Sequence, residues 1–125
     1  MQRARLRIAV VDDEETVRRA LLRVLVTSQL DAVAYASGQQ FLESLNESVP
    51  DCVVLDLQME GLTGHDVQQK LAQREMQIPV IIVTAHDNPE ARAKCLRAGA
   101  AAYLCKPLRG KHLIEAINSA VNGAV

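Results

Sequence analysis

The sequence has few aromatic residues and no long apolar run. It contains no tryptophan, and its aromatic rings are those of Tyr35, Phe41 and Tyr103. So few rings argue against a site that encloses a large planar cofactor, because such pockets use aromatic walls. No apolar run approaches the roughly 20 residues that cross a bilayer, so we expect no membrane partner.

The cysteines show no paired spacing, and we expect no leader segment. Cys52, Cys95 and Cys105 are odd in number and form no CxxC pair. They indicate free thiols in a reducing compartment rather than a disulfide framework. The basic start of the chain has an apolar run of about four residues, which is too short for a signal peptide. We therefore expect a cytoplasmic protein.

Neither sign of charge dominates. Lys and Arg number 14, Asp and Glu number 15, and the net charge is −1. The basic residues are scattered, whereas a phosphate-binding surface needs them on one face, so we expect no nucleic acid contact by this segment. The length, without repeats or low-complexity linkers, predicts a single domain over residues 1–125 with its core at about 6–122.

Short apolar runs rich in Val and Ile alternate with longer amphipathic stretches. The runs are RIAVV (7–11), DAVAYA (31–36), CVVLDL (52–57), PVIIVTA (79–85) and AAYLC (101–105). Such alternation predicts a parallel sheet with both faces covered by helices. The expected fold is α/β: a (βα)5 doubly wound, five-stranded parallel sheet in the flavodoxin-like order 2-1-3-4-5. The more alternating run 31–36 is expected near an edge.

The stretches between these runs carry helix signals. Ser37 and Thr63 suit N-cap positions, Asn88 precedes a proline that suits a first helical turn, and Gly99 suits a helix C-terminus. The stretch 14–28 also has apolar residues spaced for one helix face. These are Val17, Ala20, Leu21, Val24 and Leu25.

Polar side chains follow the apolar runs at the points where strands end. Asp12 and Asp13 follow the first run, and Asp56, Thr84 and Lys106 lie at the ends of the third, fourth and fifth. Because carboxyl ends of parallel strands share one edge of a sheet, these groups are expected to converge. The acids would repel one another, Lys106 would offset one charge, and an all-oxygen site suits Mg²⁺. A carboxylate beside Mg²⁺ suits phosphoryl transfer.

In their order and spacing, these motifs resemble those of a known family. VVDDE, VVLDLQM, IIVTAH and YLCKPL follow one another through nearly the whole chain. Together they resemble the receiver domain of two-component response regulators. The residues of these motifs are most similar to those of receivers whose outputs are helix-turn-helix transcription factors.

The resemblance implies a role for each acid. Asp56 would be the phosphoacceptor and a Mg²⁺ ligand. Asp13 would bind Mg²⁺ directly, Asp12 would bind it directly or through water, and Gln58 would offer its backbone carbonyl. The implied partner is a sensor histidine kinase or a phosphotransfer protein.

The resemblance also implies a switch. Thr84 and Lys106 would bind the phosphoryl group, Lys106–Pro107 would be a cis peptide, and Tyr103 would occupy the position of the switch aromatic. Phosphorylation would draw Thr84 inward and let Tyr103 rotate. The surface made by the fourth helix, the fifth strand and the fifth helix would then change, and it could support a phosphorylation-dependent homodimer.

Other interpretations stay open for several of these residues. Asp12 and Asp13 suit the N-terminus of a helix, Tyr103 suits ordinary strand packing, and His86 is either a loop residue or a neighbour of the site. One departure stands out, since many receivers carry proline where this chain has Glu60. We expect a more mobile loop there, and an effect of Glu60 on Mg²⁺ or phosphodonor affinity.

The expected function is a signalling switch whose enzymatic character extends only to gaining and losing its own phosphoryl group. A flavodoxin-like electron carrier would need a Ser/Thr/Gly-rich phosphate loop where this chain has Asp-Asp-Glu-Glu. A phosphatase of the haloacid dehalogenase type would need an acid where this chain has Gln58. The alternative within the family is a receiver that acts as an interaction module without phosphorylation.

Overall fold

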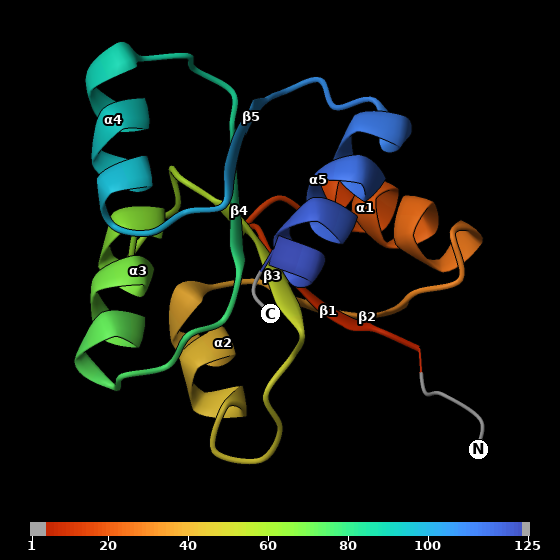
Figure 1. Ribbon diagram of the computed structural model, residues 1–125, viewed down its shortest axis with the longest axis horizontal. Helices are drawn as coiled ribbons and strands as arrows, with labels where there is room; N and C mark the ends of the chain where they lie inside the picture. Colours follow the sequence, from red (N-terminus) through yellow and green to blue (C-terminus); the bar gives the residue numbers. More distant parts are fainter. Residues whose placement is uncertain (1–4, 124–125) are drawn as a thin grey trace.

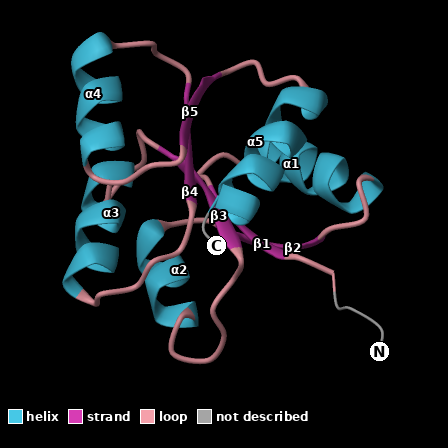
Figure 2. Cartoon of the chain, viewed as in Figure 1, coloured by secondary structure: helices cyan, strands magenta, loops and turns pink. Residues whose placement is uncertain are grey.

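The computed structural model describes residues 5–123, which form five strands alternating with five helices (Figures 1 and 2). The strands are β1 (Arg7–Val11), β2 (Asp31–Tyr35), β3 (Cys52–Asp56), β4 (Val80–Thr84) and β5 (Ala102–Cys105). The helices are α1 (Glu15–Thr27), α2 (Gly38–Ser44), α3 (Gly64–Gln73), α4 (Pro89–Arg97) and α5 (Gly110–Gly123). None of these helices is long and apolar enough to cross a membrane.

The strands form one parallel sheet in the order β2-β1-β3-β4-β5, which confirms the predicted topology. The weakly patterned β2 lies at an edge, as its alternation predicted, and Val33 is 57% exposed there. The fully buried strands β3 and β4 lie in the interior of the sheet, where both of their faces are covered.

Two layers of helices cover the sheet: α2, α3 and α4 on one face, α1 and α5 on the other (Figure 1). Strand β3 shows how the sequence serves both layers. Val53 and Leu55 pack with the first layer, whereas Cys52 and Val54 pack with the second. A strand between two layers must be apolar on both sides, so β3 reads as a continuous apolar run.

The predicted capping residues begin and end helices where the sequence placed them. The Ser37 hydroxyl accepts the backbone N–H of Gln40, Thr63 forms a capping box, and the Asn88 side chain accepts two backbone N–H groups at the start of α4. Gly99, at φ = +101°, follows the end of α4. Ala20 departs from prediction: it is exposed, because it lies along the open groove between α1 and α5.

Strand β3 and helix α3 approach each other closely at Gly64. A Cβ atom on Gly64 would lie 2.8 Å from the carbonyl oxygen of Asp56 and 2.9 Å from the Cα of Leu57. The Gly64 N–H also donates to the carbonyl of Leu57 at 2.9 Å. The end of β3 is therefore held against the start of α3 by a contact that requires glycine.

Candidate functional site

Two buried carboxylates lie side by side at the carboxyl edge of the sheet. Asp12 directly follows β1 and is 1% exposed, and Asp56 ends β3 and is 5% exposed. Because β1 pairs with β3, with Val11 opposite Leu55, the next residue of each strand meets the other at this edge. Buried carboxylates need partners, so the contacts of these two define the site.

Lys106 supplies positive charge to both carboxylates. Its Nζ donates to Oδ2 of Asp12 at 3.0 Å and lies 3.5 Å from Oδ1 of Asp56. The ammonium side chain is 17% exposed. Its backbone is fixed as well: the Lys106 N–H donates to the carbonyl of Thr84 at 2.7 Å, and the Lys106–Pro107 peptide bond is cis.

Asp12 is held by further contacts beyond this ion pair. Its Oδ1 accepts the backbone N–H of Glu14 at 2.9 Å, and its backbone carbonyl accepts Nη1 of Arg18 at 2.9 Å. The contact from α1 was not predicted from the sequence. Arg18 is half-buried on α1, but an arginine in a helix carries no local sequence signal of a main-chain partner, since most arginines keep their charged group in solvent.

Asp13 completes an acidic cluster at the same edge, but from an exposed position. Oxygen atoms of Asp12, Asp13 and Asp56 lie within 4.8 Å of one another. The Asp13 Oδ2 also accepts the backbone N–H of Glu60 at 3.2 Å, from the loop between β3 and α3. The structure thus brings together all three acids that the sequence proposed as metal ligands.

The surroundings of Asp56 disfavour its ionised form. Burial first, and then the charge of Asp12, raise the pKa of Asp56 to about 6, although Lys106 and the Gln58 N–H act in the opposite direction. Burial alone would lower the pKa of Lys106, but its hydrogen bond to Asp12 and the charge of Asp56 outweigh burial and raise it. One ammonium therefore does not offset the two buried acids.

An all-oxygen site with excess negative charge fits a divalent cation. Three carboxylates offer hard ligands, and the exposed Asp13 leaves room for water, as Mg²⁺ prefers. Gln58, whose backbone carbonyl the resemblance offered as a further ligand, lies two residues beyond the end of β3, and its side chain is exposed. These residues fit the ion that the sequence indicated.

Thr84 and Tyr103 lie on the neighbouring strands β4 and β5 and contact none of the three acids through a hydrogen bond among the described residues. Thr84 is fully buried, and its Oγ1 accepts the N–H of His86 at 3.2 Å and lies 3.3 Å from the carbonyl of His86. Tyr103 is 8% exposed and packs with the α2–α4 layer, with the guanidinium of Arg92 5.8 Å from its ring centre. Its hydroxyl is buried without a hydrogen-bond partner among the described residues.

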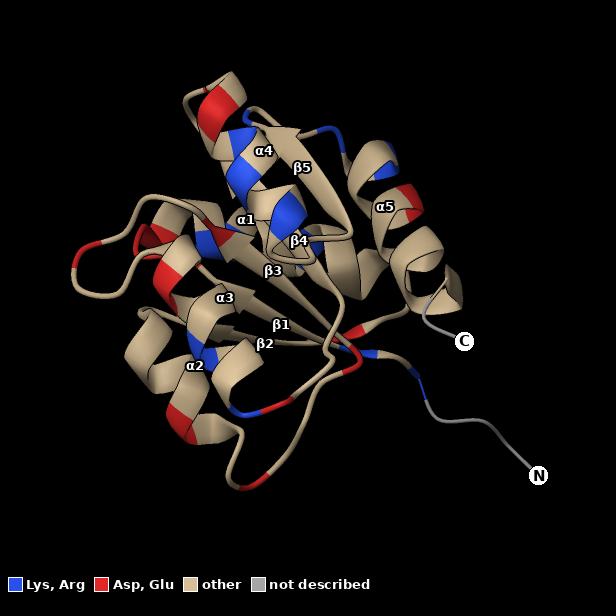
Figure 3. Cartoon of the chain, turned by 60° about the vertical axis from the view of Figure 1, so that its left-hand side comes forward, with Lys and Arg blue, Asp and Glu red and all other residues tan. Residues whose placement is uncertain are grey.

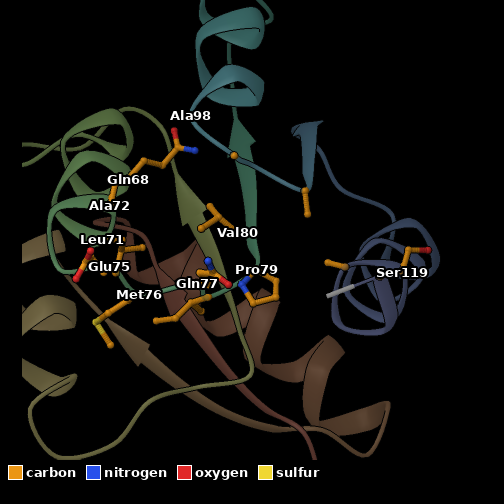
Figure 4. Close-up of a pocket in the computed structure, with 15 residues that line it drawn as sticks. Gln68, Leu71, Ala72, Glu75, Met76, Gln77, Pro79, Val80, Ala98 and Ser119 are labelled. Carbon is orange, nitrogen blue, oxygen red and sulfur yellow. The ribbon is translucent and has the colours of Figure 1, made fainter. Parts of the chain in front are cut away.

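Charge and shape mark different parts of the surface. Figure 3 shows Asp and Glu among the loops at the carboxyl ends of the strands, and Lys and Arg along α4. The pocket in Figure 4, of about 720 Å³, lies near the opposite edge, where Pro79 precedes β4, Val80 begins it and Ser119 lies on α5. Neither the acidic cluster nor Lys106 lines that pocket. The pocket is therefore separate from the candidate site, although it is large.

Residues 8–118 match the family described as the response regulator receiver domain, and the chain belongs to that family. It is similar to nodulation protein W of Bradyrhizobium diazoefficiens, with 34% identity over 113 residues that cover 90% of this chain and 50% of that protein. It is also 34% identical to the transcriptional regulatory protein TdiR of Thauera aromatica over 114 residues, covering 91% of this chain and 50% of that protein. The chain thus spans about half the length of these relatives.

Solved structures show the same fold. FixJ-N superposes with a TM-score of 0.89 at 29% identity, over 100% of this chain and 98% of that chain. A response regulator receiver protein from Burkholderia phymatum gives a TM-score of 0.83 at 40% identity, over 94% of this chain and 96% of that chain. The fold and family expected from the sequence are therefore confirmed.

Proposed function

We propose that this chain is a phosphorylation-activated switch that accepts a phosphoryl group on Asp56. One observation carries the proposal: Asp56 is a buried carboxylate at the carboxyl edge of the sheet, beside Asp12 and within 3.5 Å of the Lys106 ammonium. With a pKa of about 6, roughly nine-tenths of Asp56 side chains are ionised at pH 7. A carboxylate nucleophile must be ionised to react, and acids with strongly shifted pKa values cluster at functional sites.

Asp12, Asp13 and Asp56 would hold Mg²⁺, with the backbone carbonyl of Gln58 as a further ligand. When bound, Mg²⁺ offsets negative charge on the phosphoryl oxygens during transfer. Asp12 is already fixed by the Glu14 N–H and by Lys106, so its orientation does not depend on the ion.

In the transfer step, a carboxylate oxygen of Asp56 attacks the phosphorus of a phosphohistidine. An O–P bond forms, the P–N bond breaks, and the imidazole nitrogen leaves with the electron pair. Lys106 would pair with a phosphoryl oxygen, exchanging part of its contact with Asp56. The Thr84 hydroxyl would donate to another oxygen and give up its contacts with the His86 backbone. Hydrolysis of the acyl phosphate would end the signal.

The output would be a change of surface. Thr84 and Tyr103 lie in neighbouring strands, since β4 pairs with β5, and movement of Thr84 would free space for the Tyr103 ring. Arg92 on α4 contacts that ring, so its rotation would alter the surface of α4, β5 and α5. We propose a cytoplasmic receiver that a sensor histidine kinase or phosphotransfer protein phosphorylates. Its output would be transcriptional, of the helix-turn-helix kind, with this surface able to support a homodimer.

Intact mass measured after incubation with acetyl phosphate and Mg²⁺ tests the proposal. The wild type should gain the mass of one phosphoryl group, and Asp56→Asn should not. Asp51→Asn is a matched control, because Asp51 lies on the exposed approach to the same strand. No gain on the wild type, or an equal gain on Asp56→Asn, would reject the proposal and favour a receiver that acts without phosphorylation.

A further inference from the structure

The loop between β3 and α3 donates a main-chain hydrogen bond to the least enclosed acid of the site. The Glu60 N–H lies 3.2 Å from Oδ2 of Asp13, although the two residues are 47 positions apart in the chain. Asp12 and Asp56 are buried, but Asp13 and Glu60 are exposed. An exposed carboxylate rotates freely unless something holds it, so this bond gives Asp13 an orientation that its surroundings do not.

The geometry of the loop places the Glu60 N–H at this point. Gly61 follows at φ = +74°, a conformation that favours glycine, and the chain then enters α3 at Gly64. Gly64 is packed against the carbonyl of Asp56. The loop is thus tied to the site twice, by Glu60 to Asp13 and by Gly64 to the end of β3.

A carboxylate has two oxygen atoms and can serve two partners at once. Since the Glu60 N–H binds Oδ2 of Asp13, Oδ1 stays available to a cation. Any residue except proline could supply this donor, because proline has no N–H. The glutamate side chain adds a second feature, a negative charge beside a site for a cation.

We propose that Glu60 is a positioning residue for the metal: its main-chain N–H orients Asp13 for Mg²⁺ and ties the β3–α3 loop to metal occupancy. This inference rests on the proposed function, because it assigns Asp13 to the metal. It separates two contributions of one residue, the backbone donor and the side-chain charge.

Two variants at the same position separate these contributions. Glu60→Gln removes the charge and keeps the N–H, whereas Glu60→Pro removes both. Mg²⁺ affinity is measured without any phosphodonor, by titration calorimetry on the whole chain. We expect Glu60→Pro to bind Mg²⁺ roughly threefold to tenfold more weakly than Glu60→Gln, as the loss of one solvent-exposed hydrogen bond of ordinary strength predicts. Glu60→Ala should match Glu60→Gln.

A second measurement needs no change at Glu60 and decides the matter if Glu60→Pro does not fold. In ¹H–¹⁵N spectra of the metal-free protein, Asp13→Ala should move the Glu60 amide proton upfield, and Mg²⁺ should move the same resonance in the wild type. Equal or tighter Mg²⁺ binding by Glu60→Pro than by Glu60→Gln would overturn the inference. A Glu60 amide insensitive to Asp13→Ala would also overturn it.

These outcomes can be told apart from failure of the proposed function. If the wild type binds no Mg²⁺, the metal site and the inference both fail. If Mg²⁺ binds and Asp56 is phosphorylated, but Glu60→Pro and Glu60→Gln have equal affinities, the proposed function stands and only the positioning role of Glu60 fails.

Discussion

Replacing Asp56 with asparagine should stabilise the metal-free protein at neutral pH. Asp56 is 5% exposed, and burial together with the charge of Asp12 raises its pKa from 3.8 to about 6. The ionised side chain is therefore unfavourable in the folded state, even with Lys106 beside it. Asparagine has a similar shape and can still accept a hydrogen bond from Lys106, but it carries no charge.

The size of the effect follows from linkage between protonation and folding. The folded state holds the Asp56 proton more tightly than the unfolded chain does. The contribution of this proton to the free energy of unfolding is therefore fully present below a pH of about 4. It is lost as the pH rises through about 6. The shift of roughly two pH units corresponds to about 3 kcal/mol. We therefore expect Asp56→Asn to gain about 1 to 3 kcal/mol at pH 7 and progressively less towards pH 4.

Urea unfolding in EDTA, followed by circular dichroism across this pH range, measures the difference. Asp31→Asn is the matched control, because Asp31 is an exposed acid at the start of β2, and it should change stability by less than about 0.5 kcal/mol. A less stable Asp56→Asn variant at pH 7 would refute the reasoning. So would a stability gain that does not vary with pH.

Three further substitutions test the parts that hold the site. Lys106→Met should cost about 3 kcal/mol at pH 7, because it leaves the buried carboxylates of Asp12 and Asp56 without their ammonium; it should also raise the pKa of Asp56, measured by NMR titration. Gly64→Ala should cost about 1 to 3 kcal/mol in urea unfolding, because its Cβ would lie 2.8 Å from the Asp56 carbonyl. Thr63→Ala should cost about 1 kcal/mol, because it removes the capping box of α3.

Each of these substitutions has a control on the same kind of element. Lys111→Met removes an exposed lysine from the start of α5 and should be nearly neutral. Gly123→Ala adds a Cβ with no atom within 4 Å and should not destabilise the chain. Thr63→Ser keeps the capping oxygen and should recover most of the loss. Equal effects of a substitution and its control would contradict the explanation given for it.

Most of the fold could be predicted because each strand of this sheet has its own local signal in the sequence. Strands covered on both faces need four or five consecutive apolar residues, and β1, β3 and β4 show them plainly. The caps at Ser37, Thr63 and Asn88 are local signals and were also readable. Ala20 could not be placed in this way, because its exposure depends on how closely α1 approaches α5.

The acids, Thr84 and Lys106 could be predicted to converge for a topological reason. A parallel sheet brings the carboxyl ends of distant strands to one edge. A polar residue that directly follows an apolar run is therefore expected at that edge. The contact of Glu60 with Asp13 was not predictable, because a backbone N–H is present in every residue type except proline. The need for glycine at position 64 was hidden too, since it depends on the tertiary approach of α3 to β3.

The repulsion between the buried acids that raises the pKa of Asp56 also favours the binding of a cation at this edge. The pKa of Asp56 is raised to about 6 because burial and the charge of Asp12 disfavour its ionised form. A bound cation would stabilise that ionised form. Stabilisation by Mg²⁺ should therefore increase as the pH rises through about 6 and level off above it, since the proton and the ion compete for Asp56. Thermal unfolding with and without Mg²⁺ across this range measures the dependence. A Mg²⁺ effect of constant size on both sides of pH 6 would show that Asp56 is not a ligand, and the repulsion at this edge would then need another explanation.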